Sequence, residues 1–113
     1  MIIWHNSRCS KSRSACEILR EKGIDTTVVE YLKTPPAKEE IRYVIKLLGI
    51  KAEQLVRKNE PLFKERFSEK TLSDEEWINI LSENPILIER PIIINGNKAV
   101  IGRPPEKVLD IIG

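Results

Sequence analysis

Residues 2–13, IIWHNSRCSKSR, decide the fold of this chain, because they carry an apolar run, a polar loop with one cysteine and the start of a helix, in that order. Ile2-Ile3-Trp4 predicts a short buried strand, and the apolar spacing over residues 15–19 predicts a helix after the loop. Cys9 lies between them, where the first backbone N–H groups of a helix are unpaired and favour an anion. Its cationic neighbours are Arg8, Lys11 and Arg13. We therefore expect a Cys9 thiol that is acidified towards the nucleophilic thiolate.

Two other interpretations of this stretch are open. A lone cysteine is often only a small buried hydrophobe, although no apolar residue lies within three positions of Cys9. Ser14 and Glu17 form a potential capping box, which would start the helix later and leave Cys9 outside it.

The rest of the chain alternates between strand and helix signals. In chain order, we expect a strand over 26–32, a helix over 38–48 that ends at Gly49, short helices over 51–56 and 60–70, a helix from the capping box at Ser73 to about residue 84, strands over 92–94 and 99–101, and a last helix from Pro105. The Asn95-Gly96 pair is a strong hairpin signal between the last two strands. The last helix is expected to bury Val108, Leu109, Ile111 and Ile112.

This order predicts an α/β fold with a mixed four-stranded sheet. The first two strands are separated by a helix and should run parallel, whereas the last two should form an antiparallel hairpin. The segment from about 38 to 84 is too long for a simple crossover, so we expect a helical insertion between strand 2 and the hairpin. The 113 residues suit a single domain, 1–113.

Composition excludes several classes of function. A net charge of +2 is too small to indicate a nucleic-acid partner. No apolar run has the length of a membrane span or a secretory signal, so a reducing cytoplasm is the expected location. Two cysteines seven positions apart fit neither a zinc site nor a C-x-x-C motif, and we expect no metal and no bound cofactor. The chain is expected to be a monomer.

Five blocks of the sequence, in order, resemble the thioredoxin-like arsenate reductases of the glutathione- and glutaredoxin-dependent type. The blocks are His5-Asn6-x-x-Cys9-x-x-Ser12-Arg13, Tyr31-Leu32-Lys33-Thr34-Pro35-Pro36, Leu55-Val56-Arg57-Lys58-Asn59-Glu60, Asn84-Pro85-Ile86-Leu87-Ile88-Glu89-Arg90-Pro91-Ile92 and Gly102-Arg103-Pro104-Pro105-Glu106. Together they cover nearly the whole chain. The resemblance implies a thioredoxin-like fold and places the cysteine at the helix N-terminus, which favours the earlier helix start.

The resemblance also implies a substrate and its binding residues. Arsenate is a tetrahedral oxyanion, and the planar fork of arginine pairs two of its oxygens at once. The three arginines of the family pattern match Arg57, Arg90 and Arg103. Arg90 and Arg103 flank the two outer ends of the predicted hairpin, so antiparallel pairing should bring them together. The assignment of Arg57 to the anion site rests on the resemblance alone.

Three further residues take roles from the resemblance. Pro91 stands where thioredoxin-like proteins carry a cis-proline that faces the cysteine. His5, the only histidine, is expected to lower the pKa of Cys9. Ser12 lies on the same helical face as Cys9 and can donate its hydroxyl to the thiolate. Ser12 also stands where dithiol proteins have their second cysteine.

Cys16 does not fit the role of a resolving thiol. Seven helical residues place it about 10.5 Å along the axis from Cys9, whereas a disulfide needs Cα atoms within about 7 Å. It also belongs to the apolar stripe with Ala15 and Leu19, so we expect it in the core. An external thiol must then resolve the adduct on Cys9, and the resemblance implies glutathione as co-substrate and glutaredoxin as partner.

Two alternatives keep the fold and change the function. The chain could be a monothiol thiol–disulfide reductase or deglutathionylase, which needs Cys9 but not the arginines. It could also be a regulator of the Spx type, which binds RNA polymerase. Those regulators typically switch through C-x-x-C, and here Ser12 replaces the second cysteine.

Overall fold

Four short strands form one mixed sheet in the computed structural model, which describes residues 1–112. The strands are β1 (Ile2–Trp4), β2 (Thr27–Val29), β3 (Ile92–Asn95) and β4 (Lys98–Ile101), in the order β2-β1-β3-β4. β1 pairs parallel with β2, whereas β3 runs antiparallel to both β1 and β4. The predicted parallel pair and C-terminal hairpin are confirmed.

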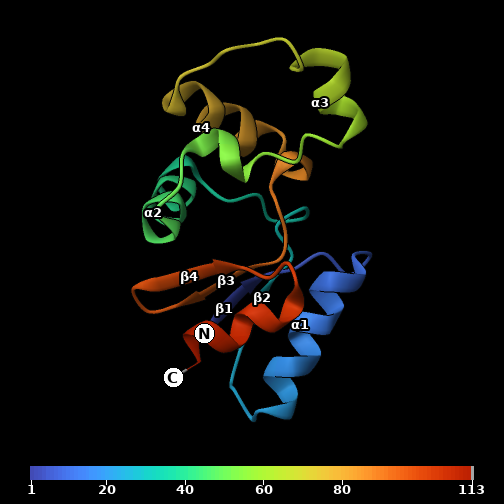
Figure 1. The fold of residues 1–113 in the computed structure, drawn as a ribbon, viewed down its shortest axis with the longest axis vertical. Coiled ribbons are helices and arrows are strands. Elements are labelled where there is room, and N and C mark those ends of the chain that lie inside the picture. The colour runs from blue at the N-terminus through green and yellow to red at the C-terminus, as the bar shows by residue number, and fades with distance from the viewer. Residues whose placement is uncertain (113) are drawn as a thin grey trace. The chain divides into compact units, whose positions relative to one another are not determined.

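Helix α1 (Ser10–Glu21) and the 3-10 helix η3 (Pro105–Ile111) cover one face of this sheet (Figure 1). Ile3 and Ile93 are register partners on the two central strands, so both point to that face. They meet the helices in one buried cluster, completed by Ala15, Leu19, Val108 and Ile111. This apolar contact fixes α1 against the sheet and so positions its N-terminus beyond the end of β1.

The last helix differs from the predicted one. It is a 3-10 helix, in which residues three positions apart fall on the same side. Val108 and Ile111 are therefore buried, whereas Leu109 is 45% exposed and Ile112 is half-buried. The prediction that Leu109 is buried was wrong, because it assumed the period of an α-helix.

The second strand is shorter than the predicted segment 26–32. After Val29 the chain turns, and the backbone N–H groups of Lys33 and Thr34 both donate to the carbonyl of Glu30, at 2.9 Å each. Tyr31 is fully buried within this turn and Leu32 is exposed. The prolines at 35 and 36 that follow have no N–H to continue a strand ladder.

The segment Pro35–Glu89 forms a compact helical unit, and residues 1–34 with the chain from Arg90 onward form the other unit. The helical unit contains α2 (Lys38–Leu48), η1 (Ala52–Leu55), α3 (Pro61–Arg66), α4 (Asp74–Glu83) and η2 (Pro85–Leu87). The predicted insertion, about 38–84, lies within it.

The ends of these helices follow from local sequence. Gly49 closes α2 at φ +66°, a left-handed conformation that glycine adopts without strain. Ser73 begins α4 with a reciprocal capping box, since its Oγ accepts from the Glu76 N–H at 3.2 Å while its own N–H donates to the Glu76 carboxylate at 3.1 Å. Trp77 of α4 is buried and stacks on Phe63 of α3, with ring centroids 6.1 Å apart.

Candidate functional site

Cys9 is the N-cap residue of α1. Its backbone is extended (φ −95°, ψ 121°), its N–H donates to the Asn6 carbonyl at 3.0 Å, and its carbonyl accepts from the Arg13 N–H at 3.0 Å. The helix thus begins at Ser10, and the later start at Ser14 is excluded. The half-buried thiol lies at the end of the helix where unpaired N–H groups gather.

The pKa of the Cys9 thiol is lowered from its ordinary value. Burial acts to raise this pKa. Hydrogen bonds from the Ser12 backbone, the Arg90 side chain and the Lys11 backbone outweigh that effect, together with the charge of Arg90. The thiolate is therefore stabilised by helical N–H groups and by an arginine from the far end of the chain.

Arg90 and Arg103 are brought together by the hairpin. The Arg103 Nε donates to the Arg90 carbonyl at 2.8 Å, and its Nη2 lies 4.0 Å from the Cys9 sulfur. The pairing of β3 with β4 continues one step further, where the Gly102 N–H donates to the Pro91 carbonyl at 2.8 Å. Two of the three predicted arginines thus face the predicted nucleophile.

Gly102 makes this close approach feasible. A Cβ atom at this position would lie 2.8 Å from the Pro91 Cγ and 3.0 Å from the Ile93 Cδ1. The Arg90–Pro91 and Arg103–Pro104 peptide bonds are both cis. Sequence reasoning did not single out Gly102, and its only sequence signal was its place directly before Arg103.

No hydrogen bond joins His5 to Cys9 within residues 1–112. Its ring Nδ1 lies within hydrogen-bonding distance of the Ser12 Oγ, at 2.7 Å, and of the Cys16 Sγ, at 3.5 Å. Burial lowers the pKa of His5, Glu30 acts to raise it and Arg13 adds to the lowering. His5 is not among the groups that lower the pKa of Cys9, and its predicted role in that lowering stays a prediction.

Ser12 is fully buried and is not the hydroxyl donor to the thiolate that we expected. Its Oγ accepts from the Asn6 N–H at 3.0 Å and lies 2.7 Å from the His5 Nδ1. Ser12 acts on Cys9 through its backbone N–H, and its side chain ties the loop to His5.

Cys16 has the character of a core residue. It packs partly buried against the cluster between α1 and the sheet, and burial raises the pKa of its thiol despite the nearby charge of Arg20. Both cysteines are free thiols. A thiol with a raised pKa is a poor nucleophile near neutral pH, which agrees with the absence of a resolving role.

Arg57 belongs to the helical unit, so its predicted convergence on Cys9 stays a prediction. Its Nε lies 3.7 Å from the Glu60 carboxylate and 3.6 Å from the Glu89 carboxylate. Sequence reasoning did not single out Glu60 or Glu89 as partners of Arg57. The spacing of Glu60, three residues after Arg57, was the available signal.

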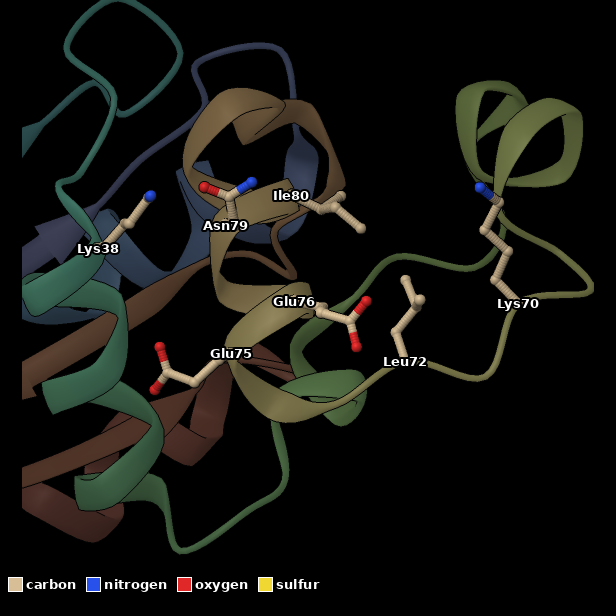
Figure 2. Close-up of a pocket in the computed structure, with 7 residues that line it drawn as sticks. All are labelled: Lys38, Lys70, Leu72, Glu75, Glu76, Asn79 and Ile80. Atoms are coloured by element: carbon tan, nitrogen blue, oxygen red, sulfur yellow. The ribbon is translucent and has the colours of Figure 1, made fainter.

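The structure also has pockets outside this constellation. A pocket of about 490 Å³ on the helical unit is lined by Lys38 of α2, by Lys70 and Leu72, and by residues of α4 that include Glu75 and Glu76 (Figure 2). Glu75 already forms a bidentate pair with Arg42. A smaller pocket of about 220 Å³ lies beside the cysteine loop, between residues 5–8 and Glu30, Leu32 and Lys33.

Two absences hold for the described chain. Among residues 1–112, no group of three histidine, cysteine or acidic side chains is placed to hold a metal ion. The same residues include no helix of the length and apolarity that a membrane span requires.

Known proteins resemble this chain along nearly its full length. The ArsC family profile matches residues 4–111. The chain is 46% identical to the Escherichia coli (strain K12) protein named "Uncharacterized protein YfgD", over 98% of this chain and 95% of that protein. It is 43% identical to an arsenate reductase of Haemophilus influenzae, over 99% of this chain and 98% of the relative.

Solved structures show the same similarity along nearly the full chain. The arsenate reductase from Vibrio cholerae superposes with a TM-score of 0.93 at 40% identity, over 98% of this chain and 96% of that one. The likeness confirms the predicted thioredoxin-like α/β fold.

Proposed function

Because this chain belongs to the ArsC family, we propose that it reduces arsenate with Cys9 as the nucleophile. The observation that carries the proposal is the meeting of three groups from distant parts of the sequence. Arg103 lies 4.0 Å from the Cys9 sulfur, Arg90 hydrogen-bonds the same thiol, and the pKa of that thiol is lowered. A relative at 43% identity bears the name arsenate reductase.

The arginines support an oxyanion as the substrate. A thiolate that only exchanges disulfides needs no cluster of guanidinium groups, because a disulfide carries no charge at the reacting atoms. Arsenate carries charge on several oxygens, and guanidinium groups around the sulfur stabilise both the bound anion and the charge in the transition state. Arg57 is the third proposed ligand.

The first step forms a covalent adduct. The Cys9 thiolate attacks arsenic, an S–As bond forms, and one arsenate oxygen takes up a proton and leaves as water. Arsenic stays in the +5 state. The product is a thiol-bound arsenate on Cys9.

The second and third steps are reductive. A glutathione thiolate attacks the Cys9 sulfur, an S–S bond forms, and the S–As bond breaks with its electron pair left on arsenic, which departs as arsenite in the +3 state. The thiol of glutaredoxin then takes the glutathionyl group and releases the Cys9 thiolate. The high pKa of Cys16 supports an external thiol for these steps.

The test is an arsenite-release assay with purified protein, glutathione and glutaredoxin. We expect arsenite only when all three are present with arsenate, and none from Cys9→Ser. Reduction of a glutathionylated peptide without arsenite release would contradict the proposal and favour the thiol–disulfide reductase.

A further inference from the structure

Arg57 is held between two carboxylates in a largely buried setting. Its Nε lies 3.7 Å from the Glu60 carboxylate and 3.6 Å from that of Glu89. The side chains of Arg57, Glu60 and Glu89 are only 16%, 15% and 27% exposed, respectively. Such pairs differ from the solvated ion pairs that contribute little on a protein surface.

The backbone fixes the distance between Arg57 and both carboxylates. The Arg57 N–H donates to the Leu87 carbonyl at 2.7 Å, and the Glu89 N–H donates to the Leu55 carbonyl at 2.8 Å. Val56 and Ile88 form an antiparallel bridge between these two segments. The Glu60 N–H donates to the Arg57 carbonyl at 3.2 Å, so a tight turn carries the second carboxylate.

Both carboxylates lie nearest the Nε atom of the guanidinium. The Arg57 Nη1 is buried and has no hydrogen-bond partner among residues 1–112. A buried N–H without an acceptor costs free energy, so such a group in a native fold calls for an acceptor from outside the chain. An anion oxygen is the strongest acceptor for a guanidinium.

We propose that Glu60 and Glu89 are positioning residues, which hold the Nε side of Arg57 so that its Nη groups face the oxyanion substrate. The inference rests on the proposed function and adds two residues to it. Glu89 directly precedes Arg90 in the sequence. Two negative charges beside an anion site repel the ligand, so their benefit must come from orientation.

This sign separates orientation from charge in an experiment. We expect the KM for arsenate to rise about tenfold in Glu89→Ala, the size of effect that follows from loss of an interaction with a charged group. Glu89→Gln keeps an acceptor oxygen and should raise the KM less. Glu60→Ala and Glu60→Gln should follow the same order. Arsenate binding by calorimetry on the same preparations gives a readout that does not depend on turnover.

Glu53→Ala is the matched control. Its carboxylate lies 2.8 Å from the Lys58 Nζ in the same unit, but both side chains are about half exposed. Its KM for arsenate should stay within about twofold of the parent, because exposed pairs hold little in place.

A double-mutant cycle tests whether Glu89 acts through Arg57. Lysine has no guanidinium to orient, so Arg57→Lys combined with Glu89→Gln should be no worse than Arg57→Lys alone. Additive losses would show that Glu89 acts elsewhere and would overturn the inference. The glutamine variants keep the shape of the side chain and serve if an alanine variant fails to fold.

The outcomes distinguish the two proposals. If the parent releases arsenite and Glu89→Ala binds arsenate as tightly as the parent or more tightly, the positioning role is wrong and the proposed function stands. If the parent neither binds nor reduces arsenate, the proposed function is wrong and the inference falls with it.

Discussion

Compare Cys9 with Cys16, two cysteines on or beside one helix. Cys9 caps α1 and lies against backbone N–H groups and two arginines, and its pKa is lowered. Cys16 lies within α1 against the apolar cluster, and burial raises its pKa. Burial acts to raise the pKa of both thiols, so the difference comes from the donors around Cys9. Position on a helix, rather than residue type, thus decides which thiol can react.

Exchange of each cysteine in turn should give the largest contrast. Cys9→Ser is expected to abolish arsenite release, because a hydroxyl near neutral pH is not a comparable nucleophile. Cys16→Ser should keep most of the activity. Both follow from one arsenite-release assay, with circular dichroism as a control for folding. Loss of turnover in a well-folded Cys16→Ser variant would contradict the monothiol scheme.

Replacement of the arginines tests whether the guanidinium groups near Cys9 are needed for arsenate reduction. Arg90→Lys and Arg103→Lys keep the charge but lose the planar fork, so kcat/KM for arsenate should fall about ten- to a hundredfold. Arg57→Lys is predicted to lose as much. Arg20→Lys, an exposed arginine on α1, is the matched control and should leave kcat/KM unchanged. Parental kcat/KM in the lysine variants of Arg90 and Arg103 would contradict the proposal that these arginines bind an oxyanion substrate.

Alkylation against pH compares the two thiols directly. The rate follows the thiolate fraction, so it rises as pH passes through the pKa, and a lowered pKa moves the midpoint to lower pH. Iodoacetamide should alkylate Cys9 with a midpoint below about 8.5 and Cys16 with one above it. Mass spectrometry of the two peptides measures both in one experiment. A Cys9 midpoint at or above that of Cys16 would contradict the claim that Cys9 is the more acidic of the two thiols.

Ser12→Ala should have the smallest effect on the Cys9 thiol. The backbone N–H that stabilises the thiolate remains, so the alkylation midpoint of Cys9 should hardly move. The variant leaves the Asn6 N–H without its acceptor, which should lower the free energy of unfolding by about 1–3 kcal/mol. Urea unfolding measures this against Ser14→Ala, an exposed serine on the same helix. A midpoint shift comparable to that expected from loss of Arg90 would show that the hydroxyl acts on the thiolate after all.

Much of the fold could be read from local sequence. Helix α2 and its closing Gly49 and the capping box of α4 follow from patterns within a few residues, and each was predicted at or near its observed bounds. The boundaries that failed depend on more distant contacts. The strand β2 ends at Val29 because the chain turns there, and η3 takes three residues per turn, so Leu109 faces outward.

The features of the candidate site also fall into two groups, those that follow from local sequence and those that depend on the tertiary fold. The sequence by itself determined the position of Cys9, because an apolar run, a polar loop and a helical stripe place it at a helix N-terminus through bonds between near neighbours. It also placed Arg90 and Arg103 together, since a hairpin signal fixes which residues flank its ends. Only the tertiary structure decided the partners of His5, Ser12 and Arg57. Side chains with several donors or acceptors choose among neighbours that the fold brings close, and sequence spacing does not encode that choice.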